Sequence, residues 1–314
     1  QQHLSNDPIE ILDEDKGSAD TSEPVEEKTD PKVIVDRLIV IGIFSFFTIF
    51  FWMAFEQAGG SMTIFANDYT NRVLEASQAD TFKIVNTLLT VVPLAIITWV
   101  LFLMSRAIIK SYPLSTTFIS ISFLIIWGIA IWMLKREFDS DVAEVPASWF
   151  GILNSFFIIA FAPVFSKIWE SKLNPSGAVK FAIGLVLLGL GFAVLAYGGR
   201  NIPQGAETAS VGMIWLCLAY LLHTLGELCV SPVGLSYVSK LAPVKLVGMM
   251  FGVWFFATFI ANTLAGLSGS FIDQISETYS ISTFFLLFTL IPVVAGIVLI
   301  ILSPVIKKKM HGIR

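Results

Sequence analysis

Charged side chains are scarce in this sequence. Only 14% of its 314 residues are Asp, Glu, Lys or Arg, whereas 55% are hydrophobic, and the mean hydropathy is +0.77. A soluble globular domain does not need so much apolar side chain, so that class is excluded. The composition is typical of a protein whose chain crosses the membrane several times.

Cysteine is also scarce, and the common catalytic motifs are absent. The two cysteines, Cys217 and Cys229, lie twelve residues apart in one apolar stretch, which makes no metal-ligand pattern. The sequence has no glycine-rich phosphate loop, no nucleophile elbow, no triad spacing and no basic patch with interleaved aromatics. We therefore expect no enzyme, no metal site and no nucleic-acid partner.

The first 36 residues are the exception to this scarcity of charge. They hold eleven acidic residues against three lysines, with Pro and Ser throughout. Such a segment cannot bury an apolar core, so residues 1–35 are predicted to form an acidic, disordered, cytoplasmic linker. At the opposite end of the chain, residues 307–314 are predicted to form a short basic cytoplasmic tail.

Eight apolar segments remain between these ends. Each is long enough to provide the ~20 residues with which a helix crosses a ~30 Å hydrocarbon core. Lipid offers the backbone no hydrogen bonds, so each segment is predicted to be a helix. The predicted spans are residues 36–66, 82–104, 113–134, 147–168, 178–199, 208–238, 244–271 and 280–306.

The basic residues predict how these spans are oriented, because cytoplasmic loops carry an excess of Lys and Arg. When the acidic linker is placed inside, fifteen basic residues fall on the inner side and five on the outer side. We therefore expect both termini to be cytoplasmic.

Two carboxylates lie deep within predicted spans. Glu56 stands between eighteen uncharged residues before it and eleven after it, and Glu227 stands between nineteen and twelve. A charged carboxylate at mid-span costs at least ~3 kcal/mol, and such residues mark substrate sites or proton carriers. The structural alternative is a protonated glutamate that only bonds to a neighbouring helix.

Aromatic and polar residues accompany both acids at helical spacing. Trp52 precedes Glu56 by four residues and His223 precedes Glu227 by four, so each pair shares a helix face. A His–Glu pair suits metal binding or proton relay, but two ligands without a third favour a hydrogen-bonded core histidine. Asn154 has an amide side chain within a further span, where it can bind a ligand or form a hydrogen bond to a neighbouring helix.

Four stretches of sequence carry a resemblance to a known family. They are FFWMAFEQAGGSMTIFAND from Phe50, ASWFGILNSFFIIAFAPVFSKIWES from Ala147, GELCVSPVGLSYVSKLAP from Gly226 and MMFGVWFFATFIANTLAG from Met249. Together they resemble the proton-dependent oligopeptide transporters, a branch of the major facilitator superfamily. The stretch from Gly226 is the most specific of the four.

The resemblance implies an all-α polytopic membrane protein. This chain looks like the carboxy-terminal six-helix bundle of a twelve-helix major facilitator fold, in which a peptide binds between two bundles. The amino-terminal bundle is then missing, so the chain should not transport by itself. Eight spans exceed six by two, so residues 82–134 are predicted to be an inserted, peripheral transmembrane hairpin. A bacterial-type inner (plasma) membrane is the implied location.

The resemblance also assigns residues to peptide binding. Family members hold the amino terminus of the peptide with a glutamate and an asparagine, which match Glu227 and Asn154. Side-chain pockets are lined by aromatic residues and their neighbours. The peptide-binding residues implied for this chain are Glu227, Asn154, Trp52, Trp254 and Thr258.

Two further acids receive roles from the same resemblance. Glu56 matches a glutamate that takes part in proton coupling and pairs with basic groups on the opposite bundle. Asp68 follows it by three helical turns and is assigned to the outer gate.

The expected function is therefore proton-coupled symport of di- and tripeptides, with this chain as half of the transporter. The expected partners are short peptides, protons, the lipid bilayer and the missing bundle, and no cofactor is expected beyond the proton as coupling ion. One alternative is half of a related proton-coupled facilitator for another nutrient or anion. The other is a non-transporting membrane scaffold whose glutamates are protonated.

Overall fold

The structure, a computed structural model, describes residues 30–140, 143–172 and 174–313. Within them, eight helical segments are long and apolar enough to cross a membrane, which confirms the predicted number. Most of the predicted acidic linker, residues 1–29, lies outside the described residues.

Long helices make up nearly all of the described chain. The α-helices are α1 (Pro31–Phe55), α2 (Ser61–Ile64), α3 (Ala76–Ile108), α4 (Pro113–Phe138), α5 (Phe150–Glu170), α6 (Gly177–Gly198), α7 (Ile214–Leu241), α8 (Val247–Gly269), α9 (Ile272–Thr278) and α10 (Ile281–Lys309). Short helical turns are η1 (Glu56–Gly59), η2 (Phe65–Tyr69), η3 (Ala147–Trp149) and η4 (Val244–Leu246). Strands β1 (Thr70–Asn71) and β2 (Val211–Gly212) form a two-residue parallel pair.

The helices extend further than hydropathy predicts at both ends of the chain. Helix α1 begins at Pro31 rather than 36, because the Asp30 side chain accepts a hydrogen bond from the Lys32 N–H and proline suits the first helical position. Helix α10 continues through Lys309, so three residues of the predicted basic tail are helical. Lysines in the last turn stabilise a helix, because their positive charge interacts favourably with the negative end of the helix dipole.

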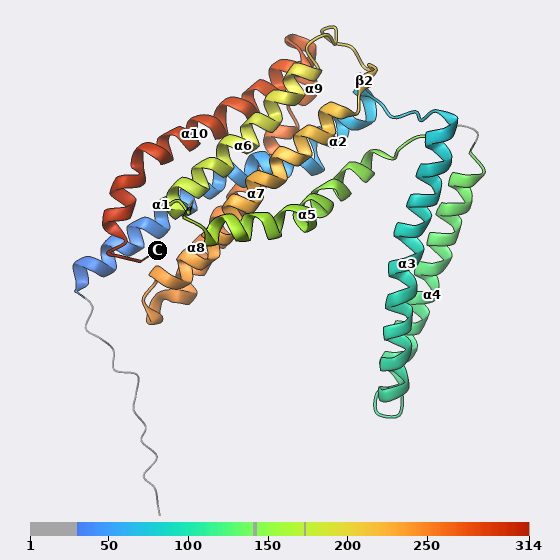
Figure 1. Cartoon of the computed structure of the whole chain (residues 1–314), viewed down its shortest axis with the longest axis horizontal. Coiled ribbons are helices and arrows are strands. Elements are labelled where there is room, and N and C mark those ends of the chain that lie inside the picture. Colours follow the sequence, from blue (N-terminus) through green and yellow to red (C-terminus); the bar gives the residue numbers. More distant parts are fainter. Residues whose placement is uncertain (1–29, 141–142, 173, 314) are drawn as a thin grey trace, which may run out of the picture.

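The main bundle is built around α6, which packs between α7 and α10 (Figure 1). Small residues permit the close approach. A Cβ atom on Gly184 of α6 or on Gly226 of α7 would lie 2.7 Å from the carbonyl oxygen of the other glycine. Such contacts replace the hydrophobic effect as the source of helix association in lipid.

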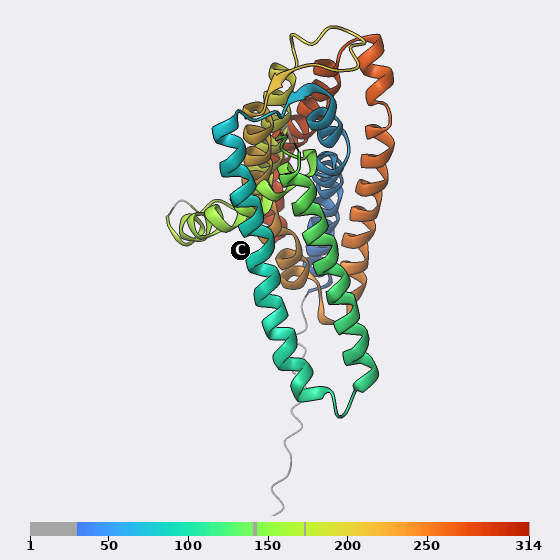
Figure 2. The same ribbon diagram turned by 90° about the vertical axis from the view of Figure 1, so that its right-hand side faces the viewer.

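Helices α3 and α4 form a hairpin that stands apart from the main bundle (Figure 1) and whose turn extends below the bundle's helices in the view of Figure 2. Among the described residues of the two helices, only Thr116 is buried. Apolar side chains therefore cover all faces of the hairpin, as expected of helices surrounded by lipid. The helices run from 76 to 138, longer than the predicted hairpin of residues 82–134.

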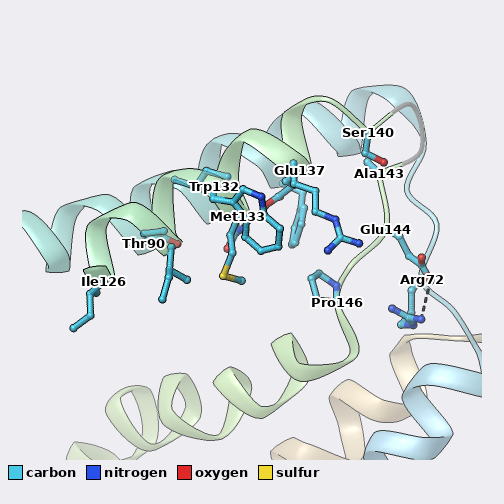
Figure 3. A pocket seen from close by; sticks show the side chains of 16 residues that line it. Arg72, Thr90, Ile126, Trp132, Met133, Glu137, Ser140, Ala143, Glu144 and Pro146 are labelled. Atoms are coloured by element: carbon cyan, nitrogen blue, oxygen red, sulfur yellow. Dashed lines mark hydrogen bonds and ion pairs between the residues drawn. The ribbon is translucent and has the colours of Figure 1, made fainter. Parts of the chain in front are cut away.

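The segment that leads into the hairpin and the segment that leads out of it are hydrogen-bonded to each other. The Leu74 N–H donates to Ala143 O at 2.9 Å, and the Val145 N–H donates to Arg72 O at 3.0 Å. The Arg72 guanidinium also forms an ion pair with Glu144 at 2.8 Å beside a cavity of about 610 Å³ (Figure 3). The hairpin thus has a closed base, and Trp149 of η3 also contacts α3, where its Nε1 donates to Asn86 Oδ1 at 3.3 Å.

This closed base makes the hairpin removable. We expect an intact protein in which Asn-Gly replaces residues 75–142 to keep its helical fold, because Leu74 and Ala143 already lie in an antiparallel bridge that a two-residue turn can close. Circular dichroism melting should show a midpoint within a few degrees of the unmodified protein. A protein that no longer folds would show that the hairpin supports the bundle.

Candidate functional site

Helices α5 and α7 bring together two of the predicted peptide-binding residues. Asn154 lies in α5, and Thr224 and Glu227 are three residues apart on one face of α7. The Asn154 Nδ2 amide donates to Glu227 Oε2 at 2.9 Å and to Thr224 Oγ1 at 3.1 Å. Both N–H groups of the amide are thereby directed at α7, which fixes the position of the half-buried carboxylate.

A cavity of about 350 Å³ lies between α1, α5 and α7, and Asn154 is the member of this pair that lines it. Phe55 and Gly59 line it from the end of α1 and from η1, Gly151 and Asn154 line it from α5, and Tyr220 lines it from α7. Its wall is mostly apolar, with the Asn154 amide as a polar group beside the carboxylate. A small apolar cavity with few polar groups is typical of a site for a small molecule.

Glu56 lies where the first span is interrupted, which differs from the continuous helix predicted through it. Helix α1 ends at Phe55, and the chain continues through η1 until Gly60 adopts ψ −105° and turns it. The carboxylate is exposed. Broken helices of this kind form the ion and substrate sites of many transporters.

Gln57 is a site residue that sequence reasoning missed. Its side chain is 1% exposed, and Nε2 donates to Ala265 O at 2.9 Å and to Ser268 Oγ at 3.3 Å on α8. Ser61 Oγ donates to Gln57 Oε1 at 2.7 Å from beyond the break. The amide therefore holds both sides of the interruption against α8.

Replacing Gln57 by alanine should loosen this support. We expect the free energy of unfolding of the intact protein to fall by about 1–2 kcal/mol, the range for a buried hydrogen-bonded side chain between membrane helices. Thermal unfolding in detergent measures the change. Gln274→Ala on exposed α9 is the matched control, and equal stability of both variants would contradict the role of Gln57.

The remaining predicted peptide-binding residues lie mainly in helix contacts. The Trp254 indole is 6% exposed and packs directly on Gly234 of α7. Thr258 Oγ1 donates to the Trp254 carbonyl oxygen within α8 at 3.2 Å. Trp52 is half-buried against the Phe55 ring, with ring centroids 5.3 Å apart. Among the described residues, none of these contacts joins the three residues to the Asn154–Glu227 pair.

Asp68 lies at the opposite end of the interrupted span from α1. It belongs to the π-helical turn η2, so the regular three-turn spacing from Glu56 that the sequence predicts does not hold. Its carboxylate accepts a hydrogen bond from Asn67 Nδ2 at 2.8 Å, and its carbonyl accepts one from the Ala209 N–H at 3.0 Å. Asp68 therefore joins this end of the span to the loop before α7.

His223 is buried in the contact between α6 and α7. The ring is 2% exposed and packs against Phe192, with ring centroids 4.5 Å apart, and against Gly191. Among the residues that the structure describes, no group of three His, Cys, Asp or Glu side chains is arranged to hold a metal ion. The hydrogen-bonded histidine favoured by the sequence is not formed, because neither ring nitrogen has a hydrogen-bond partner among the described residues. His223 instead packs this helix contact and lines the 350 Å³ cavity one turn before Glu227.

Comparison with known proteins finds that this chain is similar to proteins named as peptide transporters. The peptide transporter YePEPT of Yersinia enterocolitica is 31% identical over 282 residues, which are 88% of this chain and 42% of that protein. A di-/tripeptide transporter of Lactococcus lactis subsp. cremoris is 31% identical over 201 residues, which are 62% of this chain and 38% of that protein. The chain thus spans about two fifths of the length of these relatives.

The fold has a solved counterpart. The crystal structure of a peptide transporter POT in complex with sulfate aligns with a TM-score of 0.60 at 24% identity, over 91% of this chain and 43% of that one. This likeness confirms the predicted all-helical membrane fold. Residues 120–287, more than half of the chain, match the POT family. The chain belongs to the POT family.

Proposed function

We propose that this chain is the carboxy-terminal half of a proton-coupled symporter of di- and tripeptides. The observation that carries the proposal is the hydrogen bond from Asn154, which lines the 350 Å³ cavity, to Glu227 on α7. The peptide transporters to which the chain is similar give the substrate class. The proposal assigns movement of a solute, and not catalysis of a reaction, to the intact protein.

The pair suits the ammonium group at the amino terminus of a peptide. An ammonium has three donors and no acceptor, so it requires acceptor oxygens from the protein. Because Asn154 directs both amide N–H groups at α7, its carbonyl oxygen and the second oxygen of Glu227 are the acceptors that a ligand can use. The negative charge of Glu227 strengthens such hydrogen bonds.

Glu56 is the proposed proton-coupling residue. Its carboxylate is exposed at the interruption of the first span, where a basic group of the amino-terminal bundle would complete an ion pair. Release of that pair on protonation would link the proton to movement of the two bundles. Trp52, Trp254 and Thr258 are proposed to shape the peptide side-chain pockets, and Asp68 to belong to the outer gate.

The proposed orientation places both termini in the cytoplasm of a bacterial inner membrane. Lys309 at the end of α10 bonds to Asp36 near the start of α1, so the start of the first helix and the end of the last helix lie on the same side of the bundle. The lysines that end α7 and α10 lie at this same end of their helices. An excess of basic residues marks the cytoplasmic side.

Uptake by the intact transporter in liposomes tests the proposed function. An inward proton gradient should drive saturable accumulation of labelled dialanine, and a protonophore should abolish the accumulation. Competition by unlabelled tripeptides is expected, whereas single amino acids should compete weakly. Absence of saturable peptide uptake would overturn the proposal and favour a facilitator for another solute or a scaffold.

A further inference from the structure

A second cavity lies at the end of the bundle where α1 begins and α10 ends. It measures about 650 Å³ and is formed by the loop between α5 and α6, the last turns of α7 and the end of α10. It is separate from the Asn154–Glu227 pair and shares no lining residue with the cavity beside that pair. The proposed function leaves this cavity unexplained.

Four lysines line this second cavity. The described residues that line it include no carboxylate. The lysines come from four separate parts of the chain, so they are brought together by the fold and do not form a basic run in the sequence. They are Lys172 of the α5–α6 loop, Lys180 of α6, Lys240 of α7 and Lys307 of α10.

One described acid at this end of the bundle is engaged elsewhere. Asp36 bonds to both Lys309 Nζ and His311 Nε2, and neither partner lines the cavity. The Lys180 ammonium lies 4.5 Å from the centre of the Trp169 ring, which holds its stem beside the cavity. Lysine ammonium groups gathered around one hollow create a positive potential that an anion would offset.

The start of α6 adds to this potential. Ser176 occupies the N-cap of this 22-residue helix, but its hydroxyl lies 3.3 Å from Ser303 Oγ on α10 and does not cap the first turn. Ser176 and the preceding Pro175 both line the cavity. The positive end of the helix dipole therefore adds to the lysine charges at the same wall.

Apolar side chains share the wall with the lysines and with uncharged polar residues, and they indicate the source of the anion. Pro232, Val233 and Tyr237 of α7 face the cavity together with Met310 and Ile313 after α10. Charged lysines beside apolar side chains at the ends of membrane helices match the boundary between lipid headgroups and acyl chains. We propose that this cavity binds the phosphate headgroup of an anionic phospholipid.

Lipid titration of the intact transporter in detergent tests this proposal. Phosphatidylglycerol should raise the thermal unfolding midpoint in a saturable manner, whereas phosphatidylcholine should not. The double variant Lys172→Gln/Lys307→Gln removes two exposed lysines of the cavity. Its affinity for phosphatidylglycerol should fall roughly twentyfold, because each lysine near an anionic headgroup contributes about fivefold.

The matched control is Arg106→Gln/Lys110→Gln at the turn of the hairpin. These residues are also exposed and basic but do not line the cavity, so the variant should bind the lipid as the unmodified protein does. Unchanged lipid affinity in the cavity variant, or equal loss in the control, would overturn the proposal. Equal stabilisation by inorganic phosphate alone would show an anion site and overturn its assignment to lipid.

Discussion

Glu227→Gln in the intact transporter is expected to weaken binding of dialanine by roughly 10- to 150-fold. A hydrogen bond to a charged group contributes about 1.5–3 kcal/mol, and glutamine keeps the shape of the side chain while removing the charge. Asn154 can still donate to the new amide oxygen, so the contact between α5 and α7 should persist. Isothermal titration calorimetry with the purified protein measures the affinity.

Two controls separate recognition of the peptide amino terminus from general damage. N-acetyl-dialanine lacks the ammonium group, so its weak binding should change little in the variant. Glu137→Gln alters a second Asn–Glu pair, in which Asn86 Nδ2 donates to Glu137 Oε2 at 2.6 Å within the hairpin. It should leave dialanine affinity unchanged. Unaltered dialanine binding by Glu227→Gln would remove this assignment.

Glu56→Gln is expected to abolish accumulation driven by a proton gradient while peptide exchange across the membrane continues. One proton moving through 100 mV provides about 2.3 kcal/mol, enough to concentrate a neutral peptide several tens-fold. A glutamine cannot take up or release that proton, so the accumulation ratio should fall to about one. Parallel gradient-driven uptake and counterflow assays in liposomes measure the two activities.

The control for this variant is another exposed glutamate of the same bundle. Glu277→Gln changes an exposed carboxylate on α9, outside the interruption of the first span, and should keep full accumulation. If Glu56→Gln still accumulates peptide several tens-fold, another residue couples the proton. If it loses exchange together with accumulation, the carboxylate serves binding or folding instead.

Hydropathy predicted the eight spans because lipid permits only helices there, and their ends were least predictable. Asp30 and Pro31 start α1 within the charged segment, where the N-cap hydrogen bond outweighs polarity. The segment 208–213 was predicted to begin a span, but Val211 and Gly212 pair with Thr70 and Asn71 before α7 starts at Ile214. Only tertiary contact creates that pairing.

The interruption after Phe55 was not predicted, although its signal is visible. Gly59 and Gly60 are adjacent within an apolar run, and such pairs frequently end or bend helices. Hydropathy averages over the pair and returns one continuous span. Gln57 was not predicted, because the sequence does not show the contacts with α8 that give this uncharged amide its role.

The contact between Asn154 and Glu227 joins residues 73 positions apart on different helices. Periodicity places each on a helix face but cannot bring two faces together, so the resemblance supplied their common role. The four lysines of the second cavity show the same limit, because four separate parts of the chain contribute one each. Sequence patterns predict elements, and the packing of those elements makes both sites.

Proton movement driven by a peptide gradient tests the central claim most directly. The intact transporter is placed in liposomes that contain a pH indicator, with equal pH inside and outside and the membrane potential clamped at zero. External dialanine should acidify the interior, N-acetyl-dialanine should not, and Glu56→Gln should abolish the acidification. Dialanine entry without any acidification by the unmodified protein would contradict proton-coupled peptide transport.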